Sequence, residues 1–243
     1  MKTIVNSLWV LLVGVSLLSG CTDKVDPVVI EYGTVNDNEG NTYKTVKIGD
    51  QWWMAENLAT RYFNNGDPLA LASSSDSIVW SQAGFPSYCI YQGDPAAPGF
   101  LYNFYAITDS RGIAPQGWHI ATDEDWKKLE SFIGLSNAEK EKTGWRGAEE
   151  GDLLKQKGQN EWVRYDGVWA EDKYGFSAKA GGCRLPDGKF SVPSGLTYSG
   201  FWWTTTDKQS GKAWYRYMDY KSSKIFRSYT YYGYGMSIRC VKD

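Results

Sequence analysis

The only histidine of this chain, His119, limits the acid–base chemistry available near neutral pH. It follows Trp118 and precedes a predicted helix start, and no nucleophile-elbow pattern accompanies it to suggest a serine–histidine–acid arrangement. A zinc site built from several histidines is impossible, and the spacing of cysteines and carboxylates offers no other zinc site. We therefore expect a structural role for His119 and predict no catalytic residue, metal site or cofactor. An extracytoplasmic hydrolase or modifying enzyme is the alternative.

Cys21 ends a short apolar leader and is the clearest candidate for covalent modification. Lys2 precedes an apolar core over residues 4–18, which has the length of a signal-peptide core rather than a membrane span. The run Leu18-Ser19-Gly20-Cys21 resembles the lipobox of bacterial lipoproteins, which implies that Cys21 is acylated, for example with palmitate. We predict a signal peptide over 1–20, a lipidated tether over 21–31, and an outer-membrane or cell-surface location with the membrane as partner. An ordinary secretory signal with a chance cysteine is the alternative.

Three cysteines remain if Cys21 carries lipid, namely Cys89, Cys183 and Cys240. At most one intramolecular disulfide can then form, and an extracytoplasmic compartment permits it. We favour Cys89–Cys240, which would tie the middle of the chain to its end. Three free buried cysteines are an equal alternative.

Composition argues against a nucleic-acid-binding protein and against a helical bundle. The formal net charge is −2 and no basic patch stands out, so nucleic acid is not an expected partner. The chain contains 12 Trp, 17 Tyr and 26 Gly, which together favour a turn-rich fold with β-sheet over a helical bundle.

Aromatic residues concentrate near the end of the chain, with 12 between Phe201 and Tyr234. Residues 214–220 and 225–231 predict a hairpin in which Tyr215, Tyr217 and Asp219 share one face. Aromatic faces bordered by carboxylates suit sugar rings and also protein partners. The alternative is that neighbouring segments cover both faces. We predict these ligand-binding residues: Trp202, Trp203, Tyr215, Tyr217 and Asp219.

Residues 64–67, Asn-Asn-Gly-Asp, could supply oxygen ligands to calcium, but an ordinary polar turn explains them as well. The calcium signatures of lectins, Glu-Pro-Asn and Trp-Asn-Asp, are absent from the sequence. Our prediction therefore contains no metal.

The elements that would position these residues can be read from local patterns. Residues 33–35, 42–48 and 51–57 predict a strand meander, and residues 64–98 a long irregular excursion. Thr122 and the acids after it predict a helix start, with Trp126, Leu129 and Ile133 on one face. Weaker signals predict short helices at 101–107, 136–142 and 149–157, and a final strand at 237–241.

Six segments carry a resemblance to a known family: residues 51–58 (QWWMAENL), 101–106 (LYNFYA), 117–126 (GWHIATDEDW), 181–184 (GGCR), 201–206 (FWWTTT) and 237–243 (SIRCVKD). Taken in this order, they resemble the Fibrobacter succinogenes major paralogous domain, a family widespread in lipoproteins of Bacteroidetes and Fibrobacteres. The resemblance extends from about Gly33 to the C-terminus, and we place the domain at 32–243. One departure is Cys183, where an aromatic residue would be more usual.

The segment from Trp118 to Trp126 is also similar to the helix entry of sulfatase-modifying-factor domains, which have a C-type-lectin-like fold. This likeness implies chain ends that meet in one small antiparallel sheet. We therefore expect an α+β, C-type-lectin-like single domain with small antiparallel sheets, two or three short helices and long loops. The function we predict is that of a lipid-anchored cell-envelope surface protein, a non-catalytic binding module for glycan or protein; a purely structural envelope protein is a further alternative.

Overall fold

The computed structural model describes residues 29–73, 80, 84–191 and 196–243. The predicted signal peptide, Cys21 and most of the predicted tether lie outside the described residues. Within them the protein is a single α+β domain with three small sheets and short helices, as the sequence predicted. No helix among these residues is long and apolar enough to cross a membrane.

The first sheet has five strands in the order β1-β2-β3-β12-β7 and contains the predicted meander. Every pairing in it is antiparallel. The pairing of Val241 with Trp53 brings the last strand of the chain beside the opening strands, as the resemblance implied. The strands are β1 (Glu31–Asn36), β2 (Thr42–Ile48), β3 (Gln51–Met54), β7 (Trp118–Ile120) and β12 (Cys240–Lys242).

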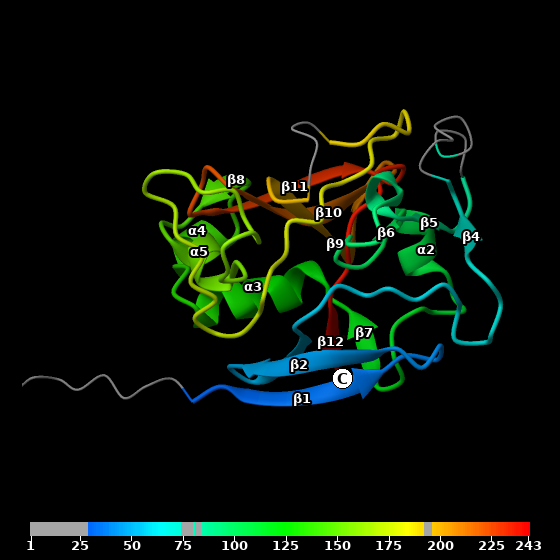
Figure 1. The fold of residues 1–243 in the computed structure, drawn as a ribbon, viewed down its shortest axis with the longest axis horizontal. Helices are drawn as coiled ribbons and strands as arrows, with labels where there is room; N and C mark the ends of the chain where they lie inside the picture. Colours follow the sequence, from blue (N-terminus) through cyan, green and yellow to red (C-terminus); the bar gives the residue numbers. More distant parts are fainter. Residues whose placement is uncertain (1–28, 74–79, 81–83, 192–195) are drawn as a thin grey trace, which may run out of the picture.

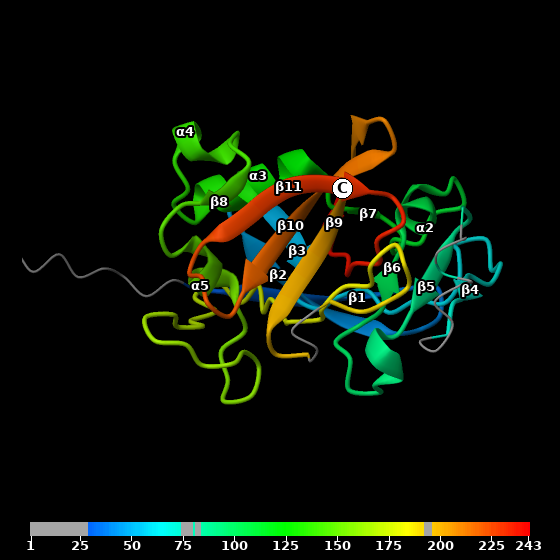
Figure 2. The same ribbon diagram turned by 90° about the horizontal axis from the view of Figure 1, so that it is seen from above.

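The second sheet has four antiparallel strands in the order β8-β11-β10-β9 and contains the predicted hairpin. Figure 2 shows β9, β10 and β11 lying across the top of the molecule. The strands are β8 (Gly144–Arg146), β9 (Ser199–Gln209), β10 (Lys212–Asp219) and β11 (Ile225–Tyr231).

The third sheet is small and joins part of the predicted excursion to the segment after it. Its strands β4 (Ala70–Leu71) and β5 (Ser87–Cys89) pair in parallel, and β5 pairs antiparallel with β6 (Leu101–Tyr102). The predicted helix at 101–107 is therefore divided, because Asn103 ends the strand and caps α2 (Phe104–Thr108) by accepting the Ala106 N–H. A 3₁₀ turn follows β5 at Tyr91–Gly93.

Helix α3 (Asp123–Phe132) lies between the first two sheets (Figure 1). Thr122 and Asp125 form a reciprocal capping box, which confirms the predicted helix start. Trp126 and Leu129 are fully buried against Trp53 of the first sheet and Trp202 of the second, in a hydrophobic layer between them. The remaining helices are α4 (Asn137–Lys140) and α5 (Glu150–Leu154), which brings the described α-helices to four, one more than expected.

Candidate ligand-binding pocket

A cavity of about 540 Å³ lies beside the end of β10, formed by residues 155–170 and Tyr220. This volume falls in the range of about 300–1,000 Å³ that is usual for small-molecule sites. The loop that forms most of the cavity projects at the lower left of Figure 2. The sequence had not indicated this cavity.

Four aromatic side chains line the cavity: Trp162, Tyr165, Trp169 and Tyr220. Trp162 is buried and forms the base, where its Nε1 donates to the Ala178 carbonyl at 2.9 Å. Tyr165 and Trp169 are 48% and 70% exposed, so they form the rim. The rings of Tyr165 and Tyr220 meet edge to face with centroids 5.9 Å apart. The cavity therefore has apolar walls that remain accessible to solvent.

The rim is shaped by a tight turn at Asp166-Gly167. Gly167 has φ +78°, a left-handed conformation that glycine adopts without a steric penalty. The turn pairs Tyr165 with Val168, whose N–H donates to the Tyr165 carbonyl at 3.1 Å. It thereby brings Tyr165 and Trp169 to the same cavity.

Asp152 of α5 anchors this loop to the body of the domain. Its carboxylate accepts the backbone N–H of Trp169 and the ammonium of Lys155, each at 3.0 Å. The Lys155 ammonium also donates to the Ser222 carbonyl at 2.7 Å, which ties the base to the β10–β11 turn. Burial lowers the pKa of Lys155, and Asp152 opposes that effect. These contacts hold the cavity in place before any ligand arrives.

Trp202 and Trp203 do not belong to a ligand site, so their assignment from the sequence was wrong. Both are fully buried. The Trp202 indole donates to Asn57 Oδ1, and the Trp203 indole donates to the Tyr102 carbonyl, each at 2.9 Å. The reason is that helices cover the two faces of the strand at these residues: Trp202 packs against Trp126 of α3, and Trp203 against Phe104 of α2.

Tyr215, Tyr217 and Asp219 do share one face of β10, but all three are half-buried. Tyr217 belongs to a row of four rings that crosses all four strands, which we call the aromatic row: Trp145, Phe226, Tyr217 and Phe201. Phe201 stacks on Tyr217 with centroids 4.4 Å apart, and Trp145 lies 5.2 Å from both Tyr217 and Phe226. The rings mainly cover each other.

Polar groups on this face are also engaged. The Tyr217 hydroxyl donates to the Asp219 carboxylate, and burial together with that contact raises the pKa of Tyr217. Burial raises the pKa of Tyr215 to about 12. The predicted exposed tyrosine pair is therefore largely a packing surface.

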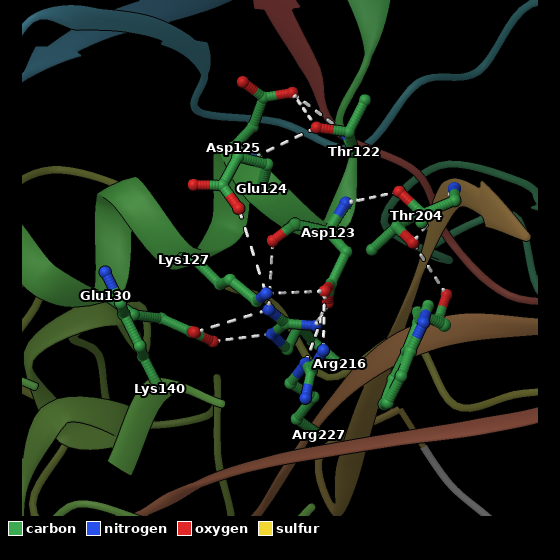
Figure 3. Close-up of polar contacts among 12 residues, drawn as sticks. Thr122, Asp123, Glu124, Asp125, Lys127, Glu130, Lys140, Thr204, Arg216 and Arg227 are labelled. Atoms are coloured by element: carbon green, nitrogen blue, oxygen red, sulfur yellow. Dashed lines mark hydrogen bonds and ion pairs between the residues drawn. The ribbon is translucent and has the colours of Figure 1, made fainter. Parts of the chain in front are cut away.

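The opposite face of the same sheet carries a buried ion cluster (Figure 3). Arg216 of β10 contacts Asp123 at 2.7 Å and Glu130 at 2.6 Å. Arg227 of β11 contacts Asp123 at 2.7 Å, and Arg146 of β8 contacts Glu130 at 2.6 Å. Burial would raise the pKa of Asp123, but the two guanidiniums lower it well below its usual value. The cluster fixes the sheet to α3.

His119 is held between two carboxylates. Its Nε2 lies 3.0 Å from Asp125 and its Nδ1 lies 2.7 Å from Asp243. The contact with Asp125 raises the pKa of His119, burial opposes it, and Asp243 adds to the rise. Both ring nitrogens are thus occupied by protein groups.

Cys89, Cys183 and Cys240 are free and buried, so the predicted Cys89–Cys240 disulfide is wrong. The two lie in different hydrophobic clusters, Cys89 with Tyr91 and Leu101, and Cys240 in β12. Burial raises the pKa of Cys89 to about 11 and that of Cys183 to about 12.

No group of three or more metal-ligating side chains occurs within the part of the chain that the structure describes. In the segment considered for calcium, Asn65 donates to Asp67 at 2.9 Å, and Arg111 contacts the same carboxylate at 3.1 Å. Asn64 donates to the Ala114 carbonyl at 3.0 Å. These side chains are occupied by other protein groups.

Residues 46–242 match the family described as the Fibrobacter succinogenes major domain. Because the match covers most of the chain, the protein belongs to that family. No curated protein and no solved structure matched the chain.

Proposed function

We propose that this protein is a lipid-anchored binding module of the cell envelope that holds a saccharide in the pocket formed by Trp162, Tyr165, Trp169 and Tyr220. The observation that carries the proposal is this cavity of about 540 Å³ with four aromatic side chains on its walls. Sugar rings present apolar C–H faces and polar edges, and aromatic side chains with polar neighbours complement both.

The exposure of Trp169 supports the proposal. A tryptophan that is 70% exposed loses the stabilisation that burial would give it, whereas a ligand stacked on it would remove that surface from water. The backbone of Trp169 is nevertheless fixed by Asp152. Because the loop is already fixed, it loses little conformational entropy when a ligand binds to its exposed rings.

The chemistry of the titratable groups supports binding without catalysis. The His119 ring already lies between two carboxylates, and the thiols of Cys89 and Cys183 are buried with raised pKa values. A thiol with a raised pKa is a poor nucleophile because the thiolate is the reactive form.

The location rests on the sequence of the leader. If Cys21 is acylated, Cys21→Ser should move the protein from the membrane fraction to the soluble fraction and abolish palmitate labelling. Cys89→Ser is the matched control, because that thiol is buried. Unchanged membrane fractionation of Cys21→Ser would contradict the anchor.

The pocket is tested by applying the soluble domain, residues 29–243, to an array of oligosaccharides. We expect at least one saccharide to bind, and Trp169→Ala to weaken that binding at least tenfold. Trp145→Ala is the matched control, since it removes another exposed tryptophan (40%) that lies in the aromatic row. Absence of binding to every saccharide, or equal loss with both variants, would overturn the proposal.

A further inference from the structure

Positive charge gathers around the same pocket although the protein as a whole is acidic, with a formal net charge of −2. Lys157 and Arg164 line the cavity and are exposed. The ammonium of Lys221 lies 5.1 Å from the centroid of the Tyr220 ring and 5.9 Å from that of Tyr165, both of which form walls. Asp166 is the one carboxylate among the cavity-lining residues.

These three cations differ from the other cation of the pocket. Lys155 is buried and its charge is neutralised by Asp152 at 3.0 Å. Among the described residues, none of Lys157, Arg164 and Lys221 lies within 4.0 Å of a carboxylate oxygen. Their charges are therefore available to a ligand. Among the cavity-lining residues, the exposed cations Lys157 and Arg164 outnumber the one carboxylate, Asp166.

We infer that the ligand of this pocket is an acidic saccharide whose sugar rings carry carboxylates. The inference rests on the proposed function and narrows its ligand class. The aromatic walls contact the apolar faces of the sugar, while Arg164 and Lys157 pair with its carboxylate. A guanidinium binds a carboxylate through two parallel hydrogen bonds, and an ammonium binds it as a point charge.

The cavity favours a saccharide over an acidic peptide. Four aromatic rings line it, of which Tyr165 and Tyr220 meet edge to face, and the exposed cations Lys157 and Arg164 lie among the same lining residues. A peptide of acidic residues would offer the carboxylates without rings to cover Trp169 and Tyr165. Peptide binding is accordingly an outcome that contradicts the inference.

The test uses matched pairs of probes in titration calorimetry: trisaccharides of galacturonate, trisaccharides of glucuronate and a sialylated trisaccharide, each with its neutral counterpart. We expect at least one acidic member to bind at least tenfold more tightly than its neutral counterpart. Raising the salt from 50 to 500 mM should narrow that difference, because salt screens exposed charges.

Arg164→Gln and Lys157→Gln should each weaken binding of the acidic member about fivefold or more and leave the neutral member unchanged. Lys128→Gln is the control, an exposed lysine on α3 outside the pocket. Two results would overturn this inference and leave the proposed function standing. One is binding without preference for the acidic member, and the other is an equal loss of affinity for the acidic and the neutral member in the Arg164 and Lys157 variants.

Trp169→Ala separates the two claims, because it should weaken the acidic and neutral members alike. Failure of every saccharide to bind would overturn both the inference and the proposed function. Binding of poly-glutamate in place of the saccharides would also overturn both.

Discussion

Two regions of this protein gather aromatic side chains, and they differ in what the rings face. In the aromatic row on the four-stranded sheet, Phe201, Tyr217, Phe226 and Trp145 lie in register and pack against one another. In the pocket, Trp169 and Tyr165 project from a loop and border a cavity.

The difference follows from the backbone. Strands pair at a fixed spacing, so rings on neighbouring strands contact each other directly and bury part of each other's surface. The loop that turns at Gly167 lies outside the described strands, so its rings are not paired across a ladder of strands. A high density of aromatic residues therefore reflects packing in the aromatic row and an accessible surface in the pocket.

The largest expected effect concerns the ion cluster that supports the aromatic row. Arg216→Met should lower the free energy of unfolding by about 3–5 kcal/mol, because it leaves Asp123 and Glu130 buried with fewer partners. Lys47→Met is the control: its contact with Glu31 at 3.6 Å is exposed, and its loss should cost less than about 1 kcal/mol. Urea titrations of both variants measure the difference. Equal losses of unfolding free energy would contradict the role of the ion cluster as a rigid support for the aromatic row.

A smaller effect separates the two aromatic regions directly. Tyr217→Ala should cost about 2 kcal/mol, since its ring contacts Phe201, Phe226 and Trp145. Trp169→Ala should cost less than about 0.5 kcal/mol, since its ring is mostly exposed. If thermal unfolding showed a larger loss for Trp169→Ala than for Tyr217→Ala, the pocket would be the packed region and the aromatic row the accessible one.

The cap of α3 tests how strongly the helix holds the sheet. Thr122→Ala should lower the free energy of unfolding by about 1 kcal/mol through the lost hydrogen bond to the Asp125 N–H. Thr122→Ser keeps the hydroxyl and should restore most of that loss. Equal losses for the two variants would show that the hydroxyl does not cap the helix.

The smallest expected effect is a pH dependence from His119. The pKa of His119 is raised in the folded state. The stabilisation of the fold by its contacts is therefore complete below the unfolded-state pKa of about 6.5 and is lost as pH rises through the folded-state pKa. The ring is partly exposed, so the contribution should stay below about 1 kcal/mol. His119→Gln should flatten the unfolding free energy between pH 6 and 9, and an unchanged slope would contradict this role.

Local patterns were enough to predict some elements. The capped start of α3 and the hairpin of β10 and β11 depend on neighbours within a few residues. The family and the α+β class also followed from the sequence. The C-type-lectin-like arrangement and the lipid anchor stay predictions.

The pocket could not be predicted because distant contacts form it. Asp152 positions Trp169, and Tyr220 arrives from the end of β10. The run from Trp162 to Trp169, three aromatic residues around an Asp-Gly turn, was the signal that could have identified it. Trp202 was misassigned because alternation along a strand says nothing about what covers each face.

The most direct test is hydrogen exchange of the backbone with and without the saccharide that binds on the array. The account predicts slower exchange at residues 157–170 and near Tyr220, with residues 144–146 and 225–228 unchanged. Slower exchange along the aromatic row, with the 157–170 loop unchanged, would contradict it and place the ligand on the four-stranded sheet.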